Sequence, residues 1–115
     1  MKTLEFEKEL KKLHCGPGQI FTTIRRDNEE NNSLYVGCEG DVFNVMVNQR
    51  KIFKARLIFV TSFDGLDWGL SDEFLSYDTD GDVESLRSRY GKGRVLMLIF
   101  QKLEEGDARH LISCV

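Results

Sequence analysis

Residues 19–25 read Gln-Ile-Phe-Thr-Thr-Ile-Arg, and this stretch decides the fold class. It is dense in β-branched and aromatic side chains, which are typical of a strand. The segment Gly16-Pro17-Gly18 comes directly before it and ends any regular element that precedes it. Thr22 and Thr23 are neighbours, so in a strand one faces the interior and the other faces outward. The sequence therefore predicts a strand over residues 19–25.

The segments on either side of this strand give different patterns. An amphipathic helix is expected over Thr3 to His14, with Thr3 near its N-cap. Its apolar face would consist of four residues at roughly helical spacing, with charged residues between them: Leu4, Phe6, Leu10 and Leu13. After the strand, residues 26–33 are rich in Asn, Asp and Glu and predict a loop.

Three further strands are expected downstream. Residues 42–47 and 52–60 alternate apolar and polar side chains, and Asn48-Gln49-Arg50 between them is a short polar turn. Two strands joined in this way form a hairpin. Residues 94–100 form the most apolar run in the chain and predict a central strand.

Two short helices are expected between the hairpin and the last strand. Ser71, followed by two acids, predicts the N-cap of a helix that runs to Tyr77. Asp82 can cap a second helix, which the segment Gly91-Lys92-Gly93 ends. The buried stripe of this second helix would consist of residues spaced by three and four: Val83, Leu86 and Tyr90. Strands around a curled sheet, with helices sealing its ends, give an α+β fold.

The length and composition indicate one globular domain. The chain has 115 residues, of which 41% are hydrophobic and 30% charged. We expect a domain over 1–103 and a loosely attached tail over 104–115. No apolar run approaches the roughly 18 residues that span a bilayer, and acids interrupt the apolar residues at the start of the chain, so neither a membrane anchor nor a secretory leader is expected. The three widely spaced cysteines suggest free thiols in a reducing compartment, hence a cytoplasmic location.

The net charge limits the class of ligand. At −3, it weighs against a protein that grips long nucleic acid over its whole surface, since neutralising phosphates supplies most of that affinity. A local basic patch would favour a short RNA, a single flipped base or a nucleoside.

No metal or cofactor is expected. The segment Asp78-Thr79-Asp80-Gly81-Asp82 invites comparison with a calcium loop, but the EF-hand needs glycine at its sixth position and glutamate at its twelfth. Here the glycine stands at the fourth position, and Arg89 stands at the twelfth. The histidines and cysteines show no spacing typical of metal ligands.

An expected helix, the turn at Gly16-Pro17-Gly18 and a strand that ends in Thr23-Ile24-Arg25 follow one another in this chain. In this order they are similar to the opening of the ASCH family of the PUA-like superfamily, whose first strand ends in Thr-Ile-Arg. A Val-Gly-Asp type turn follows in the family, and residues 36–42 match it with an insertion. Asp80-Gly81 matches an acid beside a small residue. Tyr90 and the last strand match the family's aromatic helix end and closing strand, so the resemblance spans about Leu4 to Leu103.

The resemblance implies a twisted β-barrel with short flanking helices, and RNA or a modified, cytidine-like nucleoside as the partner. Similar small bacterial proteins are amidohydrolases that remove the acetyl group from acetylated cytidine, using a lysine, a threonine and a carboxylate. The threonine falls on Thr23 and the carboxylate on Asp80, where a glutamate is usual. The lysine position falls on Ile20, and an aliphatic side chain cannot act as a base or electrophile. Binding is therefore the leading hypothesis; the alternatives are an amidohydrolase, an ASCH-type ribonuclease and a protein-interaction adaptor.

The predicted site combines two catalytic candidates, Thr23 and Asp80, with a set of ligand-binding candidates. These are Arg25, Arg26, Tyr90, Lys92 and Arg94. Arginine reads phosphates and base edges well. The turn at residues 91–94 can offer amides and two cations to a phosphate, or it can be a plain solvated turn. Trp68 can stack on a base or make a satellite hydrophobic contact.

Overall fold

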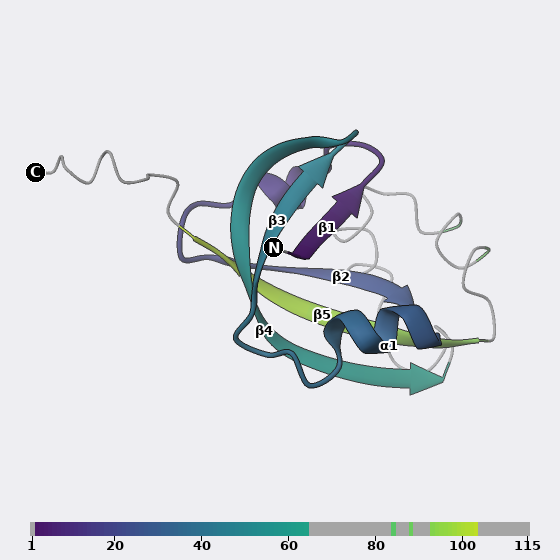
Figure 1. Cartoon of the computed structure of the whole chain (residues 1–115). Coiled ribbons are helices and arrows are strands. Elements are labelled where there is room, and N and C mark those ends of the chain that lie inside the picture. The colour runs from purple at the N-terminus through teal and green to yellow at the C-terminus, as the bar shows by residue number, and fades with distance from the viewer. Residues whose placement is uncertain (1, 65–83, 85–87, 89–92, 104–115) are drawn as a thin grey trace, which may run out of the picture.

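The computed structural model describes residues 2–64, 84, 88 and 93–103 and contains a curled, mixed five-stranded sheet (Figure 1). The strand order is β1-β3-β4-β5-β2. In chain order the elements are β1 (Lys2–Phe6), the 3-10 helix η1 (Lys11–His14), β2 (Ile20–Arg26), α1 (Glu29–Tyr35), β3 (Val42–Val47), β4 (Arg50–Asp64) and β5 (Arg94–Lys102).

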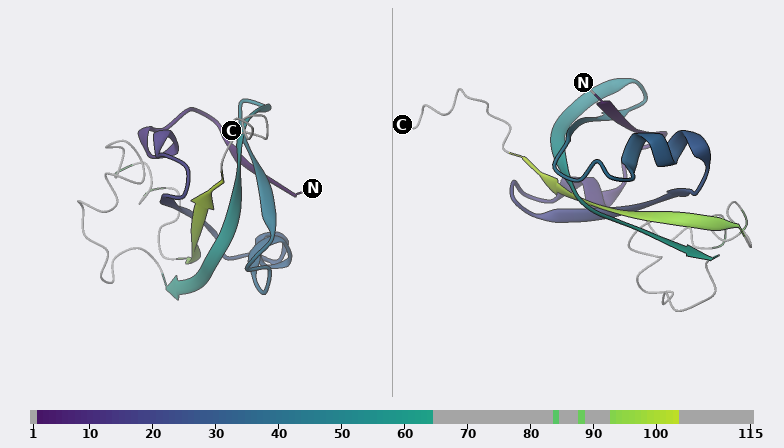
Figure 2. Two further views of the ribbon diagram at one scale, coloured as in Figure 1. Left: turned by 90° about the vertical axis from the view of Figure 1, so that its left-hand side faces the viewer. Right: turned by 60° about the horizontal axis from the view of Figure 1, so that its bottom comes forward.

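The sheet is a half-barrel, and its curvature has identifiable causes. β1 runs parallel to β3, while the pairs β3–β4, β4–β5 and β5–β2 are antiparallel. The register shifts between Val45 and Met46 and again between Leu57 and Phe59. Such bulges bend a strand and increase its twist. The long strand β4 accordingly sweeps through a strong curve, which Figure 2 shows from two further sides.

The core fills the concave face of this sheet. Phe21 stacks on Phe100 with ring centroids 5.6 Å apart, and Phe43 meets Phe100 edge to face at 5.3 Å. Tyr35, the last residue of α1, stacks on Phe43 at 5.6 Å and so fixes the helix against the same face. Each buried aromatic side chain of this kind stabilises the fold by about 1.5–3 kcal/mol.

The predicted hairpin and the two other predicted strands are confirmed. The β3–β4 turn places Asn48 at φ 51° and Gln49 at φ 67°. Two consecutive left-handed residues match the twist of a two-residue hairpin, which explains why the strands are joined here. β4 is longer than predicted, since it extends to Asp64. β2 forms as expected, and β5 has neighbours on both sides, as a central strand should.

The predicted helix over Thr3 to His14 is wrong. Lys2–Phe6 is a strand, and only Lys11–His14 is helical, as a single 3-10 turn. Leu4 and Phe6 are two positions apart, so they lie on one face of a strand as readily as on a helix. Both residues are buried. The segment forms a strand rather than a helix because it pairs with β3.

The predicted loop over residues 26–33 is also wrong, because α1 begins at Glu29. The Asn28 side chain accepts a hydrogen bond from the backbone N–H of Asn31 at 2.8 Å and caps the helix. Glu29 and Glu30 lie in the first turn, where acids favour the helix dipole. These N-terminal signals outweigh the polar composition of the segment.

The remaining predictions fall mostly beyond the described residues. The helix expected at 71–77, Trp68 and the tail at 104–115 lie outside them. Within the helix expected at 82–90, Glu84 and Ser88 are described, and both are helical. In the described part of the chain, none of the helices has the length and apolar character needed to cross a membrane.

Candidate functional site

Two rows of side chains cross β2, β5 and β4 on the concave face, and each contains a predicted site residue. The rows are Thr23–Leu98–Val60 and Arg25–Leu96–Ser62. Residues directly opposite one another in antiparallel strands share a face. The structure therefore places Thr23 and Arg25 on the same face of the sheet, where Thr23 is only 3% exposed.

Arg25 joins the two edges of the half-barrel. Its Nη2 donates a hydrogen bond to the backbone carbonyl of Glu5 at 2.9 Å, and its guanidinium lies 4.9 Å from the centre of the Phe6 ring. Glu5 and Phe6 belong to β1, at the opposite end of the strand order from β2. The Arg25 side chain thus connects β1 and β2, the two outer strands, which are not paired with each other in the sheet.

Lys12 is a buried cation beside the same strand, and the sequence analysis missed it. Its side chain comes from η1 and is 1% exposed. Its Nζ donates to the backbone carbonyl of Thr22 at 2.6 Å and lies 5.4 Å from the Phe6 ring centre. Among the described residues, Lys12 and Thr23 are the buried polar side chains. No sequence signal marks Lys12, because lysines are almost always exposed.

An open hollow of about 200 Å³ lies between α1 and the strands β4 and β5. We call it the α1 hollow. Its lining combines apolar and polar side chains: Asn32, Val36, Glu39, Val60, Thr61, Ser62 and Leu96. Val60, Ser62 and Leu96 belong to the two rows that also contain Thr23 and Arg25, so the hollow opens on the concave face.

A polar network fixes one side of the α1 hollow. Asp27 accepts hydrogen bonds from Asn32 Nδ2 at 2.6 Å and from Arg94 Nε at 3.3 Å. Arg94 Nη2 also donates to the Ser62 hydroxyl. Asp27 follows β2, and its backbone N–H pairs with the Arg94 carbonyl at 3.0 Å. The network ties α1, β2, β4 and β5 together, and Asp27 balances the charge of Arg94.

Only some of the predicted site residues lie close together in the structure. Thr23, Arg25 and Arg94 lie on the concave side of the sheet, whereas Arg26 alternates to the other face and is exposed. Ile20, which the resemblance aligns with a lysine, is 56% exposed, and Phe21 is in the core. Asp80, Tyr90 and Lys92 lie outside the described residues.

Neither a metal cluster nor a known relative identifies the site. Within residues 2–64, 84, 88 and 93–103, no group of three or more His, Cys, Asp or Glu side chains is arranged to hold a metal ion. No family model matches the chain, and no curated protein and no solved structure matches it significantly. The site must therefore be interpreted from its geometry.

Proposed function

We propose that this protein is a PUA-like ASCH domain that binds a nucleobase, carried by a modified nucleoside or a short RNA, in the α1 hollow. The observation that carries the proposal is the hollow itself. Its volume of about 200 Å³ is smaller than the roughly 300–1,000 Å³ of sites for drug-sized ligands, so it suits a single heterocycle. Val36 and the half-buried Val60 offer apolar contacts to the faces of a base, and Ser62, whose hydroxyl accepts from Arg94, has its O–H to donate to the edge of the base.

The charges around the hollow favour a base over a phosphate. Asp27 already neutralises Arg94, and Glu39 lines the hollow. A phosphate in the hollow would be repelled by the negative charge of Glu39. A carboxylate instead accepts a hydrogen bond from the exocyclic amine of cytosine. A neutral, cytidine-like ligand therefore fits the charge of the hollow better than an RNA backbone does.

Two tryptophan substitutions test this proposal. Val36 lines the hollow and is 47% exposed, whereas Ile58 lies outside its lining and is 43% exposed. Val36→Trp should fill the hollow and weaken calorimetric binding of cytidine, acetylated cytidine or a short single-stranded RNA by about 10-fold or more, the loss of about 1.4 kcal/mol. Ile58→Trp should bind as the unmodified chain does. The absence of saturable binding into the high micromolar range would contradict the proposal and favour the adaptor hypothesis.

A second candidate function, hydrolysis of an acetylated cytidine, is favoured by one observation. The resemblance requires a lysine near the threonine strand, and Ile20 removes it from the expected position. Lys12, however, brings a buried Nζ to the backbone of Thr22, next to Thr23. A lysine and a threonine hydroxyl are suited to acid–base and nucleophilic steps of amide hydrolysis.

A further inference from the structure

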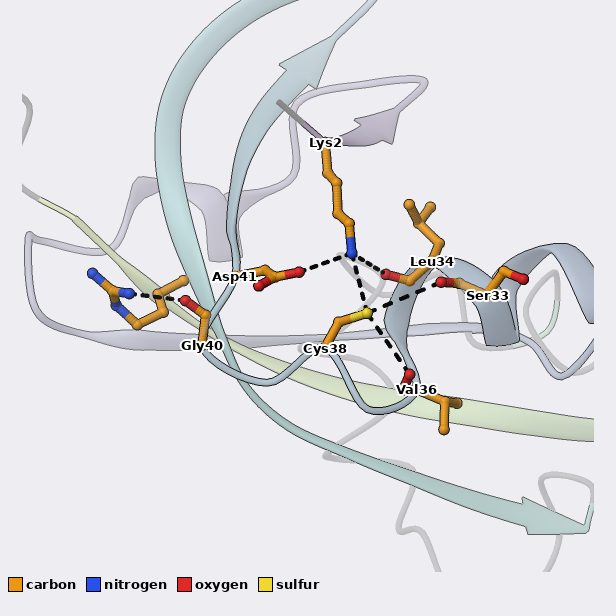
Figure 3. Close-up of polar contacts among 8 residues, drawn as sticks. Lys2, Ser33, Leu34, Val36, Cys38, Gly40 and Asp41 are labelled. Atoms are coloured by element: carbon orange, nitrogen blue, oxygen red, sulfur yellow. Dashed lines mark hydrogen bonds and ion pairs between the residues drawn. The ribbon is translucent and has the colours of Figure 1, made fainter.

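Lys2, Cys38 and Asp41 form a cluster beside the α1 hollow, and none of the three lines the hollow (Figure 3). Lys2 begins β1, and Cys38 and Asp41 lie in the turn between α1 and β3. Because β1 pairs in parallel with β3, Lys2 stands opposite Phe43, close to this turn. The pairing of an edge strand thus brings an amine and a thiol together from distant parts of the sequence.

The Lys2 ammonium is held directly against the sulfur. Its Nζ lies 3.1 Å from Cys38 Sγ, 2.9 Å from Asp41 Oδ2 and 3.3 Å from the Leu34 carbonyl. An ammonium has three N–H donors, so these three acceptors match them in number. The Sγ therefore accepts from a charged donor, and it also lies 3.7 Å from the Val36 carbonyl and 4.0 Å from the Ser33 carbonyl, to which the thiol form can donate.

The cluster is within reach of small reagents. Cys38 is partly exposed, and the Lys2 side chain is 33% exposed. Cys15, the other free cysteine of the described residues, is also partly exposed. The lysine contact near Cys15, from Lys102 Nζ at 2.9 Å, goes to its backbone carbonyl rather than to its sulfur. Cys15 therefore provides an internal comparison for Cys38.

We propose that Cys38 is a peroxide-sensitive modification site whose oxidised sulfur is captured by Lys2 as a covalent sulfur–nitrogen cross-link. The oxidant is hydrogen peroxide. The inference does not rest on the proposed nucleobase site, because the reaction uses Lys2 and Cys38, and neither residue lines the hollow.

In the first step, the Cys38 thiolate attacks one peroxide oxygen. The S–O bond forms, the O–O bond breaks, and sulfur loses two electrons to the peroxide. The hydroxide that leaves takes a proton from the Lys2 ammonium and becomes water. The hydrogen bonds that Lys2 donates to Asp41 and, second, to Cys38 raise the pKa of Lys2, so this proton is present at neutral pH.

In the second step, the neutral Lys2 amine attacks the sulfur of the sulfenic acid. The S–N bond forms, the S–O bond breaks, and the hydroxide leaves with the proton that nitrogen loses, as a second water. Overall, a thiol, an amine and one peroxide give a sulfenamide and two waters. Sulfenic acids condense with a backbone nitrogen to sulfenamides, and the more nucleophilic lysine amine forms and breaks the same bonds. The product joins the edge strand β1 to the α1–β3 turn.

Intact-mass and peptide mass spectrometry of the full chain test the proposal. After peroxide treatment, the chain should lose the mass of two hydrogens, and a peptide pair linked through Lys2 and Cys38 should appear. Dithiothreitol should reverse both changes. Cys15→Ser should behave like the unmodified chain, and Cys38→Ser should give no cross-link.

Lys2→Arg separates capture from oxidation. Arginine retains the positive charge but lacks a nucleophilic amine, so Cys38 should still oxidise and should now be trapped as a sulfenic acid by dimedone. Loss of the cross-link in this variant, with trapping of Cys38 retained, supports the proposal. If the unmodified chain gives no Lys2–Cys38 link, or if Cys38 is oxidised no faster than Cys15, the proposal is overturned.

Discussion

At the residue scale, Lys12 carries an energetic cost that needs an explanation. Removing an ammonium from water costs several kcal/mol unless good partners replace the solvent. The carbonyl of Thr22 and the face of Phe6 are among these partners, at 2.6 Å and 5.4 Å from Nζ. An apolar side chain of similar length would avoid the cost, since replacing a buried charge by a hydrophobic residue is often neutral or stabilising. A chemical role for the Lys12 amine would account for a buried lysine at this position.

The substitution Lys12→Met separates the two roles. Methionine fills a similar volume without the charge, so the free energy of unfolding should change by no more than about 1–2 kcal/mol. Release of cytidine from acetylated cytidine, followed by chromatography, should fall by about 10²–10⁴-fold, the usual effect of removing an acid–base group. The exposed neighbour Lys11 gives the control, Lys11→Met, which should keep the activity. Equal activity in both variants would remove Lys12 from the mechanism.

The position of a single residue could be predicted from the sequence where its own strand determines that position, and not where packing between distant segments does. The common face of Thr23, Arg25 and Arg94 follows from strands that the sequence predicts, whereas their roles in a site stay a prediction. The helix expected over Thr3 to His14 predicts Lys12 among its charged residues, whereas the burial of Lys12 arises from the packing of η1 against β2. No pattern within residues 3–14 indicates that this segment packs against the strand at residues 20–26.

At the element scale, α1 supports the proposed site, because Asn32 and Val36 come from it and its C-cap. Asn28→Ala removes the oxygen that accepts from Asn31 N–H, so urea unfolding should show a loss of about 1 kcal/mol. Asn28→Asp keeps an acceptor and should restore the stability. Ligand affinity should follow the same order. An alanine variant as stable as the parent chain, or an aspartate variant as unstable as the alanine variant, would show that this cap does not stabilise α1.

Helices and strands were predicted correctly where a single hydrophobic periodicity dominated the sequence of the segment. β2, β5 and the β3–β4 hairpin are rich in β-branched or alternating residues, and all of them form. β1 was mistaken for a helix because Leu4 and Phe6 fit both periods. α1 was missed because its polar composition concealed the Asn28 cap and the acids of its first turn.

At the scale of the whole molecule, the approach of β1 to β2 is a property of the curled sheet. The two strands are the outer members of the strand order, yet Arg25 spans them. The curvature depends on the register shifts in β3–β4 and β4–β5 pairing, and no motif in the sequence predicts those shifts. The α+β class was therefore predictable, whereas the residues that bring the edges together were not.

Closure of the half-barrel can be measured by hydrogen exchange. Arg25→Met should lower the free energy of unfolding by about 1–2 kcal/mol, since a charged donor to a backbone carbonyl is lost, and should speed amide exchange in β1 more than in the β3–β4 hairpin. Arg56 is the matched control, because it also donates a guanidinium N–H to a carbonyl, that of Gly40, at 2.9 Å, but contacts the turn before β3 instead of β1. Arg56→Met should leave β1 exchange unchanged. Uniform acceleration across the sheet in both variants would mean that Arg25 does not specifically join the edges.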